Sequence, residues 1–288
     1  MTAQETFGRR LHAALAERGP FCAGIDPHPG LLAAWGLDDD AAGLERFSRT
    51  AVEALGDTVA VLKPQSAFFE RHGSRGVAVL ERVIADARAA GALVLLDVKR
   101  GDIGSTMQAY ADAYCDPASP LCADAVTVSP YLGFESLRPV LDTALAHGNG
   151  VFVLALTSNP EGPEVQHARG ADGRTVAGTM LDHVRAANTA ALAGTEPLGS
   201  VGVVVGATTG GNGEDLAVGG PLLAPGIGAQ GATVEDLATV FGAALPQVVP
   251  SASREVLGAG PDLDALRRAA RGTIDAMRDL LFRASAGA

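Results

Sequence analysis

The sequence predicts an α/β protein, a (β/α)8 TIM barrel in which residues 1–288 form a single domain. Two observations lead to this prediction: short apolar runs of strand length recur along the chain, and amphipathic helical patterns separate them. The runs are nearly continuous rather than alternating, as expected for parallel strands covered on both faces. Eight such units over roughly 250 residues favour a closed barrel, because an open doubly wound sheet more often has about five or six strands.

Runs rich in Val, Leu, Ile and Ala define the predicted strands. They cover residues 21–25, 59–62, 92–96, 123–128, 151–156, 201–205, 222–224 and 247–249. Each run has the length of a strand and is too short for a membrane-spanning helix. We therefore expect eight strands and no association with a membrane.

Helical spacing of apolar residues marks the segments around these strands. The stripe in residues 7–15 predicts a helix ahead of the first strand. The patterns in 44–55 and 77–87 predict two further helices, the second of which stops at Gly91 in a C-cap position. A long stripe over 263–281 predicts a C-terminal helix that packs on the barrel.

Composition and charge limit the partners. The chain carries 22 Lys and Arg against 33 Asp and Glu, and its net charge of −11 argues against nucleic acid and anionic membranes. A pocket can still focus positive potential on a small anion, so the charge does not exclude a phosphate ligand. The six histidines show no metal-ligand spacing, so we expect no metal site.

The cysteines and the first residues predict a cytoplasmic protein. Cys22, Cys115 and Cys122 are odd in number and lack C-x-x-C spacing, which suits reduced thiols. Residues 1–10 carry both acids and bases and lack the apolar core of a secretory signal.

The most informative segment is the charged block 97–102, which ends the apolar run 92–96. Alternate side chains of a strand share a face, so Asp97 and Lys99 are expected to point the same way, while the turn at Gly101 can aim Asp102 back or outward. Barrel enzymes keep their chemistry at this end of the strands. The block by itself is explained equally well by a structural ion-pair network.

Polar residues also follow other predicted strands. Asp26 precedes a proline turn and is suited to sugar hydroxyls, although capping of the turn explains it as well. Lys63 places a cation at the same rim, where a snorkelling lysine is the alternative. Ser158 lies in a Thr-Ser-Asn-Pro turn that suits a polar ring but needs no ligand.

Two neighbouring loops predict a phosphate site. The glycine-spaced loop 225–231 can surround an anion with its amides, and Gln230 can donate a side-chain hydrogen bond. Arg254 follows the next strand and adds a fixed cation. Loops after strands 7 and 8 are the usual phosphate site of a barrel. The long loops 158–175 and 208–220 are either lids or insertions, and composition does not decide between them.

These strand-end residues, in this order, resemble the orotidine 5′-monophosphate decarboxylase family, and its longer bacterial branch in particular. The resemblance spans nearly the whole chain, and its most specific parts are residues 63–65, 97–106 and 225–231. The chain has Ser253 before Arg254 where the family usually has glycine, and Gly104-Ser105 where Pro-Asn is commoner.

The resemblance implies decarboxylation of orotidine 5′-monophosphate to uridine 5′-monophosphate without a metal or cofactor. Asp97 and Lys99 would be the catalytic pair. Lys63 and Asp102 would complete a charge tetrad, with Asp102 and Thr106 reaching the partner's site in a homodimer. The implied substrate contacts are Asp26 to ribose, Ser158 to the pyrimidine, and Gln230 and Arg254 to the phosphate.

Two other functions compete with this expectation. Related magnesium-dependent sugar-phosphate aldolases and decarboxylases share an Asp-x-Lys-x-x-Asp core but use an acid near the end of strand 2 for the metal, where this chain has Lys63. A phosphate-binding protein without catalysis would keep Gln230 and Arg254, yet it has no need for Lys63, Asp97, Lys99 and Asp102 together.

Overall fold

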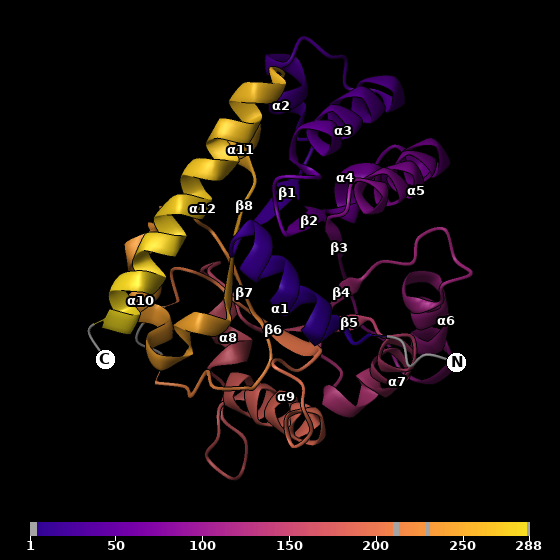
Figure 1. Cartoon of the computed structure of the whole chain (residues 1–288). Coiled ribbons are helices and arrows are strands. Elements are labelled where there is room, and N and C mark those ends of the chain that lie inside the picture. Colours follow the sequence, from indigo (N-terminus) through magenta and orange to yellow (C-terminus); the bar gives the residue numbers. More distant parts are fainter. Residues whose placement is uncertain (1–4, 210–212, 229–230, 287–288) are drawn as a thin grey trace.

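The protein is a closed parallel barrel, seen in a computed structural model that describes residues 5–209, 213–228 and 231–286 (Figure 1). Within these ranges eight strands follow one another around the barrel in chain order, and β1 closes it by pairing with β8. The strands are β1 Cys22–Ile25, β2 Val61–Pro64, β3 Leu93–Arg100, β4 Ala125–Val128, β5 Gly150–Leu156, β6 Val201–Val205, β7 Leu222–Pro225 and β8 Val248–Ala252. The predicted (β/α)8 barrel is confirmed.

Helices surround the barrel, and α1 lies across one of its ends (Figure 1). They are α1 Phe7–Arg18, α2 Pro29–Ala34, α3 Ala41–Leu55, α4 Ser66–Glu70, α5 Gly73–Ala89, α6 Gly104–Cys115, α7 Arg138–Ala146, α8 Gly162–Gln166, α9 Val176–Leu192, α10 Val234–Phe241, α11 Arg254–Leu257 and α12 Leu263–Ala286, with 3-10 turns η1 Phe134–Leu137 and η2 Gly242–Gln247. The predicted helices correspond to α1, α3, α5 and α12, and Gly91 follows α5 with the positive φ of 89° that its place after a C-cap requires. None of the described helices is long and apolar enough to span a bilayer.

Helix α1 closes the amino-terminal end of the barrel. Its Phe7 ring meets Phe152 of β5 edge to face, with 6.0 Å between ring centroids, and belongs to the apolar cluster inside the barrel. The ring comes so close to Gly150 that a β-carbon there would lie 2.2 Å from it. The open end of the barrel is therefore the opposite one, where the strands end.

Four strands run further toward that end than their apolar patterns predict. β2 continues to Pro64, β3 to Arg100, β7 to Pro225 and β8 to Ala252, beyond the predicted ends at 62, 96, 224 and 249. Lys63, Asp97 and Lys99 consequently lie inside strands and not after them, which corrects the sequence analysis. The apolar pattern stops before the backbone pairing does, because the side chains at these positions face a cavity that charged residues line.

Helix α12 covers one side of the barrel. It packs along α3, α10 and α11, and Figure 1 shows it as the long yellow helix beside the C-terminal strands. Leu266, Ala270, Ile274 and Met277 are buried in that contact. The stripe of the sequence is thus the packing face of a structural helix.

Candidate active site

A cavity of about 450 Å³ opens at the carboxyl ends of the strands. Six of the residues singled out from the sequence line it, namely Asp26, Lys63, Asp97, Lys99, Ser158 and Arg254. They come from segments up to 228 residues apart (254 − 26), which the parallel barrel brings to one rim. Six of the residues named from the strand ends therefore lie together in one cavity.

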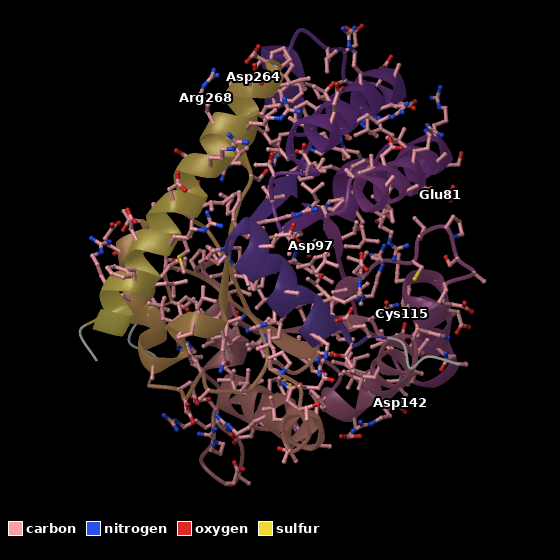
Figure 2. The ribbon with its side chains drawn as sticks, in the orientation of Figure 1. Glu81, Asp97, Cys115, Asp142, Asp264 and Arg268 are labelled. Atoms are coloured by element: carbon pink, nitrogen blue, oxygen red, sulfur yellow. The ribbon has the colours of Figure 1, made fainter. Side chains whose placement is uncertain are left out.

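Asp97 is the centre of a buried charge chain. Its Oδ2 accepts a hydrogen bond from Lys63 Nζ at 3.2 Å, and its Oδ1 accepts one from Lys99 Nζ at 2.5 Å. The side chains of Lys63 and Asp97 are each 7 % exposed, whereas that of Lys99 is 43 % exposed. In Figure 2 Asp97 lies near the centre of the molecule among the strands, while the labelled charged residues of the outer helices lie at its edge. Of the two lysines that bond to Asp97, Lys99 is thus the more accessible to a ligand.

The backbone of β3 departs from regular geometry to place Lys99. The pairing of β3 with β4 shifts register between Leu96 and Arg100, and Lys99 has a φ of 46°, in the left-handed region that non-glycine residues rarely adopt. Such a conformation costs about 1–3 kcal/mol and is typical of functional sites. Strand alternation predicted only that Asp97 and Lys99 point the same way; their side chains also meet, through this irregular turn of the backbone.

Thr127 of β4 holds both members of the pair, and the sequence analysis missed it. Its hydroxyl donates to Asp97 Oδ1 at 2.7 Å and accepts from the Lys99 backbone N–H at 3.0 Å. The side chain is almost fully buried. The available signal was a hydroxyl residue near the end of the predicted strand 123–128, whose other polar residue is Asp124, because a buried hydroxyl needs hydrogen-bond partners.

The pKa values of Lys63 and Asp97 favour the charged form of both side chains. Burial raises the pKa of Asp97, but attraction to Lys63 and Lys99 and the bonds from Lys99 and Thr127 outweigh burial and lower it to about 2. Burial likewise opposes the charged form of Lys63, yet attraction to Asp26 and Asp97 raises its pKa above the ordinary value. The cavity therefore has a permanent negative charge between two ammonium groups near neutral pH.

Two polar atoms at the β1 and β8 side of the cavity are buried with no hydrogen-bond partner among the described residues. They are Asp26 Oδ1 and Ser253 Oγ. Buried polar atoms are rarely left unpaired, so an acceptor and a hydroxyl at this wall suit a ligand that carries hydroxyl groups. His28 and Phe68, whose rings lie edge to face 4.2 Å apart, form an adjoining wall that the sequence analysis missed.

The predicted phosphate end is described in part. Arg254 begins α11, is exposed and lines the cavity together with residues 225–227. The amides of Gly228 and Gly231 donate to carbonyls within their own loop, at 2.9 and 2.8 Å, so these two do not contribute to an anion cradle in this conformation. Gln230 lies outside the described residues.

Asp102 and Thr106 lie apart from Lys63, Asp97 and Lys99 of their own chain. Neither lines the cavity. Asp102 accepts a hydrogen bond from the Ile103 N–H at 2.8 Å, and Thr106 is exposed in the first turn of α6.

The part of the chain that the structure describes contains no group of three or more His, Cys, Asp or Glu side chains that could hold a metal ion.

The fold and the site together define a class: a barrel enzyme with paired acid and amine groups at the carboxyl ends of its strands. Residues 20–269 match the model of the Orotidine 5′-phosphate decarboxylase / HUMPS family. The chain belongs to this family.

Named relatives agree with this assignment. A protein from Salinispora arenicola named orotidine 5′-phosphate decarboxylase is 69 % identical over 267 residues, which cover 92 % of this chain and 95 % of the relative. One from Streptomyces coelicolor with the same name is 66 % identical over 267 residues, again 92 % of this chain and 95 % of the relative. A Streptomyces avermitilis crystal structure, provisionally given that name, is 64 % identical with a TM-score of 0.93 over 96 % of both chains.

Proposed function

We propose that this protein decarboxylates orotidine 5′-monophosphate to uridine 5′-monophosphate and CO2, the last step of de novo UMP synthesis. The observation that carries the proposal is the chain Lys63, Asp97, Lys99 in the cavity at the strand ends, in a member of the decarboxylase family. The proposed reaction involves no net oxidation or reduction, and it needs no metal or cofactor.

Lys99 is the proposed proton donor. When the bond from ring carbon 6 to the carboxylate breaks, CO2 leaves and the electron pair stays on carbon 6. The Lys99 ammonium stabilises this charge and then gives carbon 6 a proton, and solvent restores the lysine. A rate of about 10 s⁻¹ requires a barrier of roughly 16 kcal/mol.

Asp97 is proposed to lie beside the carboxylate that leaves. Two negative charges about 4 Å apart repel by about 1 kcal/mol in water and by about 4 kcal/mol at an effective dielectric constant near 20. The low pKa of Asp97 keeps this charge in place across the neutral range. Because the repulsion is too small to account for the reaction alone, the binding of ribose and phosphate has to supply the remainder.

The proposed substrate contacts place one end of the nucleotide on each wall. Asp26 would accept hydrogen bonds from ribose hydroxyls, and its unpaired buried oxygen supports that role. Ser158 would bind the pyrimidine, and Arg254 with Gln230 the phosphate. Ser158 and Arg254 both line the cavity.

We further propose a homodimer in which Asp102 and Thr106 complete the partner's site. Both residues lie outside the cavity of their own chain. Ile103, next to Asp102, is 61 % exposed, and Tyr131 and Leu132, which follow the neighbouring strand β4, are 77 % and 53 % exposed. We propose that a second copy covers these apolar side chains. We also propose a cytoplasmic location, which the three free, buried cysteines support, and neither nucleic acid nor a membrane as partner.

Shared sites can be tested by subunit mixing. Lys99→Ala and Asp102→Ala proteins, each inactive alone, are expected to regain activity when mixed, because one of the two sites in a mixed dimer then carries both native residues. Verified mixed dimers without activity would contradict the shared site.

The reaction itself is tested with purified protein, orotidine 5′-monophosphate and EDTA, following the loss of orotate-type ultraviolet absorbance and identifying the product. We expect turnover in EDTA and its loss in Lys99→Ala, which should still bind uridine 5′-monophosphate. Unchanged turnover in Lys99→Ala would refute the assigned role. Activity that appeared only with magnesium and a sugar phosphate would favour the aldolase-type reaction instead.

A further inference from the structure

The loop after β5 is closed by a side chain that does not itself line the cavity. Gln166, the last residue of α8, accepts a hydrogen bond from the Thr157 backbone N–H at 2.9 Å through its Oε1. Its Nε2 donates to the Thr157 hydroxyl at 2.6 Å. One amide group therefore fixes both the backbone and the side chain of Thr157.

The bonds continue from Thr157 along the loop. Its hydroxyl, having accepted from Gln166, donates to Asn159 Oδ1 at 2.6 Å, and Asn159 Nδ2 donates to Glu161 Oε2 at 3.0 Å. The direction of each bond depends on the one before it, because a hydroxyl has a single proton to donate. The Asn159 bond lowers the pKa of Glu161, so the last acceptor stays ionised near neutral pH.

Ser158 lies between the two residues that this chain of bonds fixes. Thr157, Ser158 and Asn159 all line the cavity, whereas Gln166 stands behind them. On its other side Ser158 meets Gly206, where an added β-carbon would lie 3.1 Å from the Ser158 nitrogen and 3.2 Å from its β-carbon. The segment is therefore held from both sides before any ligand binds.

We propose that Gln166 is a positioning residue for the base-binding wall of the site: it holds residues 157–159 in the conformation in which Ser158 meets the pyrimidine ring. This inference rests on the proposed function, because it takes the ring to lie at Ser158. A loop that is ordered before binding loses less conformational freedom when the ligand arrives, so its restraint increases affinity for the part of the ligand it touches. The effect should be confined to the base, since Asp26 and Arg254 follow other strands, β1 and β8.

The test compares two ligands that differ by the base. Uridine 5′-monophosphate and ribose 5-phosphate share the phosphate and the sugar, and calorimetry gives the dissociation constant of each. In Gln166→Ala we expect the constant for uridine 5′-monophosphate to rise by about 10-fold, because the ligand then has to order the loop that Gln166 ordered before. The constant for ribose 5-phosphate should stay near its native value, because that ligand has no base to touch the loop.

Two further variants sharpen the comparison. Gln166→Glu keeps the acceptor for the Thr157 N–H but loses the donor, so the Thr157 hydroxyl turns toward it and releases Asn159; we expect an intermediate loss. Glu164→Ala removes an exposed side chain from the same short helix and should bind both ligands like the native protein. Native-like binding by Glu164→Ala would show that removing a side chain from α8 does not by itself weaken binding.

Failure of the inference and failure of the proposed function give different results. Native protein that neither converts orotidine 5′-monophosphate nor binds uridine 5′-monophosphate would overturn the proposed function and this inference with it. Native protein that does both, with Gln166→Ala weakening the two ligands equally or neither of them, would overturn only the role of Gln166.

Discussion

Replacing Thr127 by valine removes one hydroxyl from the centre of the site and keeps the shape of the side chain. The hydroxyl bonds to an ionised carboxylate at 2.7 Å and to the Lys99 N–H at 3.0 Å. A hydrogen bond to a charged group contributes about 1.5–3 kcal/mol and one between neutral groups about 0.5–1.5 kcal/mol. The added methyl group recovers about 1 kcal/mol by burial. We therefore expect Thr127→Val to lower the free energy of unfolding by about 2 kcal/mol.

The same variant should lose activity for a separate reason. Without the acceptor on Thr127, the Lys99 backbone loses the hydrogen bond that its N–H makes at a φ of 46°, and we expect the ammonium to shift relative to Asp97. We expect kcat/KM for orotidine 5′-monophosphate to fall by about 10- to 100-fold, which corresponds to roughly 1.4–2.8 kcal/mol of transition-state stabilisation.

Thr127→Ser is the matched control, because it keeps the hydroxyl and loses the methyl group. Deleting a buried methyl group costs about 1 kcal/mol, so the serine variant should also be less stable than the native protein, yet it should retain most of its kcat/KM. Urea unfolding at one protein concentration and steady-state kinetics in EDTA give the two quantities. Equal activity of the valine variant and the native protein, or equal loss in the serine and valine variants, would refute the role of the hydroxyl.

Two further predictions concern the same rim. Asp97 has a folded-state pKa of about 2 against an ordinary value of 3.8, so its charge adds about 2 kcal/mol of stability above pH 4 that disappears as the pH falls toward 2. Asp97→Asn should therefore show a shallower loss of unfolding free energy between pH 4 and pH 2 in urea titrations, and an unchanged slope would contradict the assigned pKa. Gly206→Ala puts a β-carbon 3.1 Å from the Ser158 nitrogen and should raise KM, with an overpacking cost of about 1–3 kcal/mol in thermal unfolding; native KM would show that the loop after β5 yields freely.

Local pattern was sufficient for the elements that bury apolar surface. The stripes in α3, α5 and α12 repeat every three to four residues because one face of each helix packs against the barrel, and this periodicity is visible without knowing what the face touches. The ends of β2 and β3 were less predictable. Backbone pairing there continues through Lys63 and Asp97, whose polarity suggested that the strands had already stopped.

Some residues of the site could likewise be predicted from the sequence, and others could not. Asp26, Lys63, Asp97 and Ser158 could be named because a barrel brings all strand ends to one rim, so order along the chain implies proximity in space. Thr127 and Gln166 were not named, because their importance depends on which atoms they touch. A threonine in an apolar strand and a glutamine at the end of a short helix are ordinary residues until the partners of their hydrogen bonds are known.

Residue type and spacing along one chain were enough to predict the barrel, the charged rim and the family resemblance. The bend of β3 at Lys99, the contact of the Lys99 ammonium with Asp97, the bonds of Thr127 to both residues and the place of Asp102 outside its own cavity depend on tertiary contacts. The physical reason is that hydrogen bonds and ion pairs act over about 3 Å, and distances of that size are set by the packing of strands far apart in sequence.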